Sequence, residues 1–126
     1  MKVLFAGCGD IGVRAIRMLS DNGLNDHWQT LAMRRKPSAL PSDIEVIKGD
    51  LCDNKNFLSI LDNSNVDVIV VTLTPDSMSD QGYLDSYVTG ANVLKSTLKK
   101  TSYRPQLIIW ISSTGVYSQS CGEWVD

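Results

Sequence analysis

The sequence predicts an α/β fold in which one parallel β-sheet lies between two layers of helices. Short runs of aliphatic residues recur along the chain, as the buried strands of a parallel sheet require. Segments with the helical spacing of apolar residues separate these runs. Strands that alternate with helices in this way form parallel sheets with right-handed crossovers. We therefore expect a three-layer sandwich with five parallel strands in the order 3-2-1-4-5, in one domain over residues 1–126.

The first half of the chain contains three predicted strands and two predicted helices. The opening apolar run at residues 2–6 leads directly into a glycine. The helix that follows has apolar residues at i, i+4 and i+7/i+8 and a stop signal at Gly23. The remaining elements of this half are strands at residues 28–33 and 44–47 and a helix at residues 54–61.

The second half contains the clearest strand, a long helix and a last strand. Nearly all side chains at residues 66–73 are β-branched or aliphatic. A polar loop at 74–82 then precedes an amphipathic helix at 83–100, and residues 107–111 form the fifth strand. The predicted inner face of the long helix contains Leu84, Tyr87, Ala91, Leu94 and Leu98. A full doubly wound fold continues beyond this point, so we expect a C-terminally truncated portion of one.

The composition argues against several functional classes. A net charge of -2 and a pI of about 5.2 do not suit a nucleic-acid-binding protein. No apolar run approaches the roughly 20 residues that span a bilayer, and the N-terminus lacks the regions of a signal peptide. The three cysteines have no Cys-x-x-Cys spacing, which argues against a disulfide framework and a zinc site. We expect a cytoplasmic protein without a metal, nucleic-acid or membrane partner.

A glycine-rich segment follows the first strand and opens the first helix. Gly7, Gly9 and Gly12 have the spacing Gly-x-Gly-x-x-Gly. The first permits a tight turn, the second lets the backbone approach a pyrophosphate, and the third lets the helix pack closely on the strand. Backbone N–H groups of the first helical turn, with Asp10 and Ile11, face the phosphates, while the Asp10 carboxylate has to point away. In this context the motif predicts a Rossmann-type domain that binds a dinucleotide. A glycine-rich turn in a non-binding α/β protein is the alternative.

The residues after the second strand bear on the choice between NAD and NADP. NAD sites carry an Asp or Glu about 20 residues past the glycines, where it binds the ribose 2′-hydroxyl. This chain has Arg34 and Arg35 there, and no carboxylate lies between Gln29 and Lys36. An arginine can pair with the 2′-phosphate of NADP. We predict NADP rather than NAD, with Arg34 as the first choice of contact and Arg35 as the second. Solvated loop charges are the alternative interpretation.

Two further strand ends carry candidate cofactor contacts. Asp50 and Leu51 follow the third strand, where the Asp50 side chain can accept a hydrogen bond from an adenine amino group. Leu73 ends the fourth strand at the carboxyl edge, where ligands of open α/β sheets bind, and its backbone can line the ribose. Both segments are also compatible with ordinary turns.

The segment after the fifth strand, Ser112-Ser113-Thr114-Gly115-Val116-Tyr117, is the most distinctive one. Together with the glycine motif and Gly49-Asp50-Leu51, it resembles the extended short-chain dehydrogenase/reductase family, which includes nucleotide-sugar epimerases and dehydratases. The atypical NAD-dependent epimerase/dehydratase members are the most similar. Residues 122–126 resemble the Val-Asp-Glu-like segment of that family, so the resemblance extends over essentially the whole chain.

The resemblance implies roles for individual residues. Ser113 takes the place of the catalytic Ser/Thr that hydrogen-bonds a substrate hydroxyl or carbonyl. Gly7, Gly9 and Gly12 bind the pyrophosphate, and Asp50 binds the adenine. The implied substrate is a small molecule, either a sugar nucleotide or another compound with a carbonyl or hydroxyl group.

The sequence also departs from the family pattern. The Tyr-x-x-x-Lys pair of the family would lie beyond Asp126, and Ser118 stands where a glycine usually follows the tyrosine. Residues 87–90 read Tyr-Val-Thr-Gly where the family often has Asn-Val-x-Gly. Without the phenol and the lysine, no group is present to transfer the proton that accompanies hydride transfer. We expect this chain alone to be inactive.

Whether the protein is an enzyme remains open at this point. The alternative is a regulatory module that senses NAD(P) without catalysis. Modules of this kind that gate potassium transport usually keep the acidic residue after the second strand and lack the Ser-Ser-Thr-Gly-Val-Tyr segment, and both features count against them. A sheet that ends at residues 107–111 exposes an apolar edge, so we also expect association through that edge, with a homodimer as one form.

Overall fold

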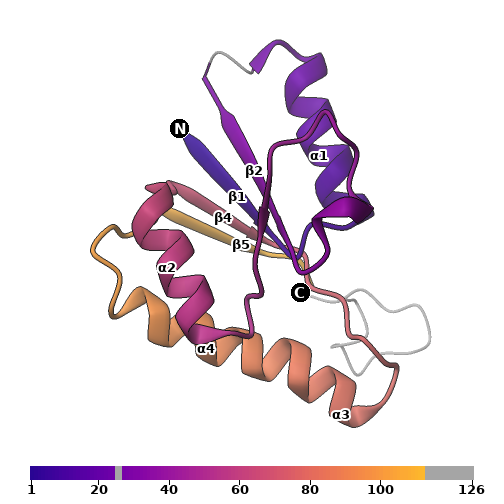
Figure 1. Ribbon diagram of the computed structural model, residues 1–126, viewed down its shortest axis with the longest axis vertical. Helices are drawn as coiled ribbons and strands as arrows, with labels where there is room; N and C mark the ends of the chain where they lie inside the picture. The colour runs from indigo at the N-terminus through magenta and orange to yellow at the C-terminus, as the bar shows by residue number, and fades with distance from the viewer. Residues whose placement is uncertain (25–26, 113–126) are drawn as a thin grey trace, which may run out of the picture.

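A five-stranded parallel sheet forms the centre of the computed structural model, which describes residues 1–24 and 27–112 (Figure 1). Its strands are β1 (Lys2–Ala6), β2 (Gln29–Arg34), β3 (Val46–Lys48), β4 (Val68–Val71) and β5 (Leu107–Trp110). Their order is β3-β2-β1-β4-β5, and every neighbouring pair is parallel. The predicted architecture and strand order are confirmed. Because β2 and β4 flank β1, the carboxyl end of β1 lies at the point where the strand order reverses.

Helices cover both faces of the sheet. Figure 1 shows α1 (Asp10–Asp21) on one side, and α2 (Asn54–Ser64) with α4 (Thr89–Leu98) on the other. A short helix, α3 (Asp80–Tyr83), runs into α4 through one π-helical segment, η3 (Leu84–Val88), and a 3-10 turn, η2 (Pro37–Ala39), follows β2. None of the described helices is long and apolar enough to cross a membrane.

The alternation of side chains along β1 divides the core into two layers. Val3 and Phe5 pack with Ile16 of α1 in one buried cluster, whereas Leu4 belongs to the cluster that Phe57 of α2 joins. Complete burial of a side chain such as Phe57 stabilises the fold by about 1.5–3 kcal/mol relative to exposure. The continuous apolar runs of the strands are therefore explained by burial on both faces.

The third strand was expected at 44–47 and lies at Val46–Lys48, and Ala91 of the predicted inner face is exposed. Two further features differ from the sequence-based expectation. β4 covers only Val68–Val71, because the flanking residues of the 66–73 run lie outside the paired register of the sheet. The helix expected at 83–100 begins earlier, at Asp80, and is interrupted by η3. The wider π turn changes which residues face inward, so Leu84 is 49% exposed and its predicted place on the inner face is wrong. Leu94, beyond the π turn, is buried as predicted.

Candidate functional site

The turn between β1 and α1 is held in place by its neighbours on both sides. Gly7 has φ +82°, a left-handed conformation that favours glycine, and a Cβ there would lie 2.8 Å from Leu73 Cδ2. The backbone N–H groups of Gly7 and Cys8 both donate to the Met33 carbonyl at 3.1 Å. On the other side, the Thr72 hydroxyl donates to the Gly7 carbonyl at 3.2 Å. The turn is thus fixed between the ends of β2 and β4.

The other two glycines of the motif have different surroundings. A Cβ at Gly12 would lie only 2.6 Å from Cys8 Sγ, so this glycine allows α1 to pack against the turn. A Cβ at Gly9 would meet nothing nearer than the Gly7 carbonyl oxygen at 4.0 Å. Gly9 is also the N-cap residue of α1, and its position has no side-chain cap hydrogen bond. The backbone at Gly9 is therefore open to a ligand, and the first turn of α1 has N–H groups for an anion.

A cavity of about 330 Å³ lies above this turn, at the carboxyl edge of the sheet. It is bounded by the turn, by the ends of β2, β3 and β4 and by η3. Its lining residues are Gly7, Gly9, Met33, Arg34, Arg35, Gly49, Asp50, Leu51, Cys52, Leu73, Thr74, Pro75, Asp76, Asp85 and Ser86. The structure thus brings together residues from four strand ends, which is the position where ligands of open α/β sheets bind.

The two arginines after β2 differ in their contacts. Arg35 forms a two-point ion pair with Asp76, in which Nη1 lies 2.7 Å from Asp76 Oδ2. The hydrogen bonds from Arg35 lower the pKa of the Asp76 carboxyl, and the same contact raises the pKa of Arg35. Within residues 1–24 and 27–112, Arg34 forms no ion pair with a carboxylate. It is half-buried in the cavity wall and lowers the pKa of the Cys8 thiol, although burial of that thiol raises it more.

The cofactor contacts predicted at the ends of β3 and β4 lie at the same cavity with different degrees of access. Asp50 is partly exposed, and its Oδ1 accepts a hydrogen bond of 2.8 Å from the Cys52 N–H. Leu51 is 1% exposed and packs in the core cluster shared with α2, so its side chain is a core residue. Leu73 is partly buried between Gly7 and Gly90, and its position at the cavity wall agrees with the expectation for the end of β4.

Two predicted site residues do not line the cavity with their side chains, and a third lies outside the described residues. The Asp10 carboxylate pairs with Arg14 at 2.9 Å on the exposed face of α1, as required for a carboxylate that points away from phosphate. Ile11 is 56% exposed, and neither residue belongs to the cavity wall among the described residues. Ser113 lies outside the described residues.

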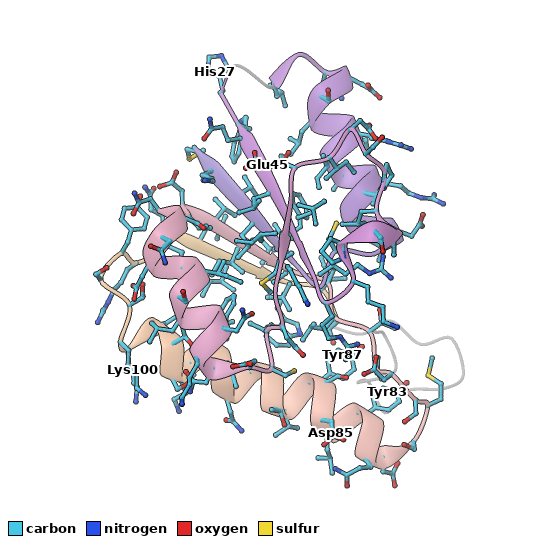
Figure 2. The ribbon with its side chains drawn as sticks, in the orientation of Figure 1. His27, Glu45, Tyr83, Asp85, Tyr87 and Lys100 are labelled. Carbon is cyan, nitrogen blue, oxygen red and sulfur yellow. The ribbon has the colours of Figure 1, made fainter. Side chains whose placement is uncertain are left out.

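The structure adds residues that the sequence analysis did not select. Asp76 follows β4, Cys52 follows β3, and Asp85 and Ser86 belong to η3. Cys52 Sγ lies 3.5 Å from the Asp85 carbonyl oxygen, which connects η3 to the cavity wall. Figure 2 shows Tyr83 and Tyr87 on the side of this helix that faces the carboxyl edge of the sheet. A π-helical segment at a binding site is a recognised association, but no sequence pattern marked it here.

The fold and the glycine turn define a Rossmann-type α/β domain. No family model matches the sequence, and no curated protein matches it significantly. Solved structures do match. A protein from Methylobacillus flagellatus, provisionally named an NAD-dependent epimerase/dehydratase, is 29% identical with a TM-score of 0.71, over 99% of this chain and 41% of its own. A provisionally named epimerase from Burkholderia cenocepacia is 19% identical with a TM-score of 0.75. The match covers 99% of this chain and 41% of the epimerase.

A third structure is the UDP-glucose 4-epimerase of Thermus thermophilus in complex with NAD, with 16% identity and a TM-score of 0.64, over 79% of this chain and 34% of its own. The two less similar structures share the fold alone. The chain spans about two fifths of the length of the first two proteins. Its resemblance to the epimerase/dehydratase branch of the short-chain dehydrogenase/reductase proteins, expected from the sequence, is confirmed over that portion.

Proposed function

We propose that this chain is the NAD(P)-binding domain of an epimerase-, dehydratase- or reductase-like protein, and that it prefers NADP to NAD. The observation that carries the proposal is the open backbone at Gly9, which faces a cavity that also contains Arg34 and Arg35. These arginines follow β2, where NAD-binding domains carry a carboxylate for the ribose 2′-hydroxyl.

Several features of the cavity fit a dinucleotide. The space at Gly9 would be filled by a Cβ, so a glycine is needed for close approach of a pyrophosphate. The first turn of α1 adds N–H donors and the positive end of the helix dipole. Arg34 has a guanidinium group suited to a 2′-phosphate, and Asp50 retains one carboxylate oxygen for an adenine amino group. Asp10 and Ile11 would bind the phosphates through their backbone N–H groups only.

The substrate and the catalytic group follow from the resemblance alone. We propose a small-molecule substrate, either a sugar nucleotide or another carbonyl or hydroxyl compound. The bound nicotinamide would supply the hydride acceptor or donor. Ser113 would orient a substrate oxygen, but a serine hydroxyl does not ionise near neutral pH and so does not move the proton. We therefore propose that this chain binds cofactor without turnover, and turnover abolished by Ser113→Ala would contradict this.

The cofactor preference is tested by titrating NADP and NAD into the chain by calorimetry, with Arg34→Ala as the variant. Loss of one charge-assisted contact should weaken NADP binding by about 1.5–3 kcal/mol, roughly ten- to a hundredfold, and NAD binding little. Arg17→Ala is the matched control, because Arg17 is an exposed arginine on α1 outside the cavity wall. Equal losses for both cofactors in Arg34→Ala would contradict the preference for NADP.

A further inference from the structure

The ion pair between Arg35 and Asp76 joins two segments of the cavity wall. Arg35 follows β2 and Asp76 lies in the loop after β4, 41 residues further along the chain. β1 lies between these two strands and ends at Gly7, so the pair joins the loops on either side of the glycine turn. Both residues line the same cavity as Gly7 and Gly9. A ligand that occupies the turn therefore meets this ion pair.

The other carboxylates around the cavity have local partners. Asp50 Oδ1 accepts from the Cys52 N–H at 2.8 Å, and Asp85 Oδ1 accepts from Gln81 Nε2 at 2.8 Å along its own helix. Asp76 is the carboxylate that pairs with an arginine of the cavity wall, within the part of the chain that the structure describes. Arg34 and Arg35 are consequently not equivalent: the first has no carboxylate partner there and the second is held by Asp76.

The ion pair is weak enough to be exchanged for a ligand. Its two side chains are 57% and 70% exposed, and pairs with this exposure change an equilibrium constant by about fivefold at most. A phosphate monoester has a charge of about −1.5 to −2 and three acceptor oxygens, so it is a stronger partner for a guanidinium group than one carboxylate.

We propose that Asp76 sets the cofactor discrimination of this cavity by competing with the 2′-phosphate of the dinucleotide for Arg35. This inference rests on the proposed function, because it requires a dinucleotide at the glycine turn. The carboxylate holds Arg35 across the cavity when the ligand has no 2′-phosphate. A ligand with a 2′-phosphate binds the Arg35 guanidinium in place of Asp76. Asp76 thus reduces the advantage of NADP over NAD that the two arginines create.

The test is a double-mutant cycle on this chain, with NADP, NAD, and the fragments adenosine 2′,5′-bisphosphate and AMP as probes in calorimetric titrations. Asp76→Asn should tighten binding of NADP and of the bisphosphate about two- to fivefold and leave NAD and AMP within twofold. In an Arg35→Ala background, Asp76→Asn should change none of these affinities. Asp43→Asn is the matched control, because it removes an exposed carboxylate from the Arg17 ion pair outside the cavity wall.

The outcomes separate this inference from the proposed function. A chain that binds none of the four probes overturns both. Binding of NADP that Asp76→Asn does not tighten, or tightens equally for NAD, overturns the inference alone. An Asp76→Asn effect that persists in the Arg35→Ala background also overturns it, because the carboxylate would then act on the ligand as a general charge and not through Arg35.

Discussion

The amino and carboxyl edges of the sheet differ in how their polar groups are hydrogen-bonded. At the amino edge, the Asp67 carboxylate accepts hydrogen bonds from the Lys2 N–H, at 2.8 Å, and from the Tyr103 hydroxyl. The terminal ammonium group of Met1 donates to the His27 carbonyl at 2.7 Å. At the carboxyl edge, the first turn of α1 has no side-chain cap and Gly9 faces open space. The proposed dinucleotide would bind at this open edge, where the first turn of α1 has N–H groups for its phosphates.

Gly9→Ala should have the largest effect on binding and a small effect on stability. The added Cβ has room in the free protein, but it occupies the space that a pyrophosphate needs. Overpacking of this kind should weaken NADP and NAD alike by about 1–3 kcal/mol, or roughly five- to a hundredfold. Calorimetric titration and thermal unfolding of the same samples measure both properties.

The control for this prediction is Gly23→Ala, at the end of α1 and away from the cavity wall. Gly23 has φ +69°, so alanine there should reduce the free energy of unfolding by about 1–2 kcal/mol and leave cofactor affinity unchanged. If Gly9→Ala bound dinucleotides as tightly as the unsubstituted chain, the carboxyl edge would not be the phosphate site.

Asp67→Asn should affect stability without affecting binding, and its effect should depend on pH. Hydrogen bonds from Tyr103 and Lys2 lower the pKa of the Asp67 carboxyl below its ordinary value of 3.8. A lowered folded-state pKa gives stability that is present above the unfolded pKa and lost as pH falls through the folded one. We expect a melting temperature a few degrees lower at neutral pH, and a difference that shrinks on acidification below about pH 4.

The measurement is thermal unfolding between neutral pH and pH 3, with Asp43→Asn as the exposed-carboxylate control. A difference that grew on acidification would have the wrong sign for a depressed pKa. Reduced cofactor affinity in Asp67→Asn would show that the two edges of the sheet are energetically coupled.

The smallest expected effect concerns the β5 edge of the sheet. Within residues 1–24 and 27–112, β5 is an edge strand, and its Leu107, Ile108 and Ile109 are 51%, 38% and 41% exposed. Unpaired, apolar edge strands favour association, so light scattering should rise with the concentration of the chain. Ile109→Lys should reduce this rise, whereas Met18→Lys, at an exposed apolar residue of α1, should not. A monomer at all concentrations would contradict the predicted homodimer.

The sequence predicts the sheet and the glycine turn well because their signals are local. Each buried strand is a short aliphatic run, and the positive φ of Gly7 and the close packing at Gly12 follow from their motif positions. The predicted length of β4 was wrong at both ends because pairing, not composition, decides where a strand ends. The assignments of Ser113 and of NADP stay predictions.

The site was predictable only where a strand end carried a motif. Asp76 lies in a polar loop, and its partner Arg35 is 41 residues away, so nothing local indicates that the two side chains meet. Leu51 was expected at the cofactor and borders the cavity, but its side chain is also 1% exposed in the core, a double position that the strand-end pattern does not indicate. The π turn at Leu84–Val88 depends on how two flanking helices pack and has no residue pattern of its own.

That π turn also has a consequence for comparison with any related protein that has a continuous α-helix at this place. An α-helix advances about 100° per residue, so the one additional residue in a π turn rotates everything after it by about that angle relative to everything before it. Deletion of one residue between Leu84 and Val88 would restore a continuous α-helix. Either Gly82 or Gly90 would then be rotated away from the atoms that it now closely contacts. An ungapped alignment with a protein whose corresponding helix is α-helical throughout would therefore pair residues correctly on only one side of the turn.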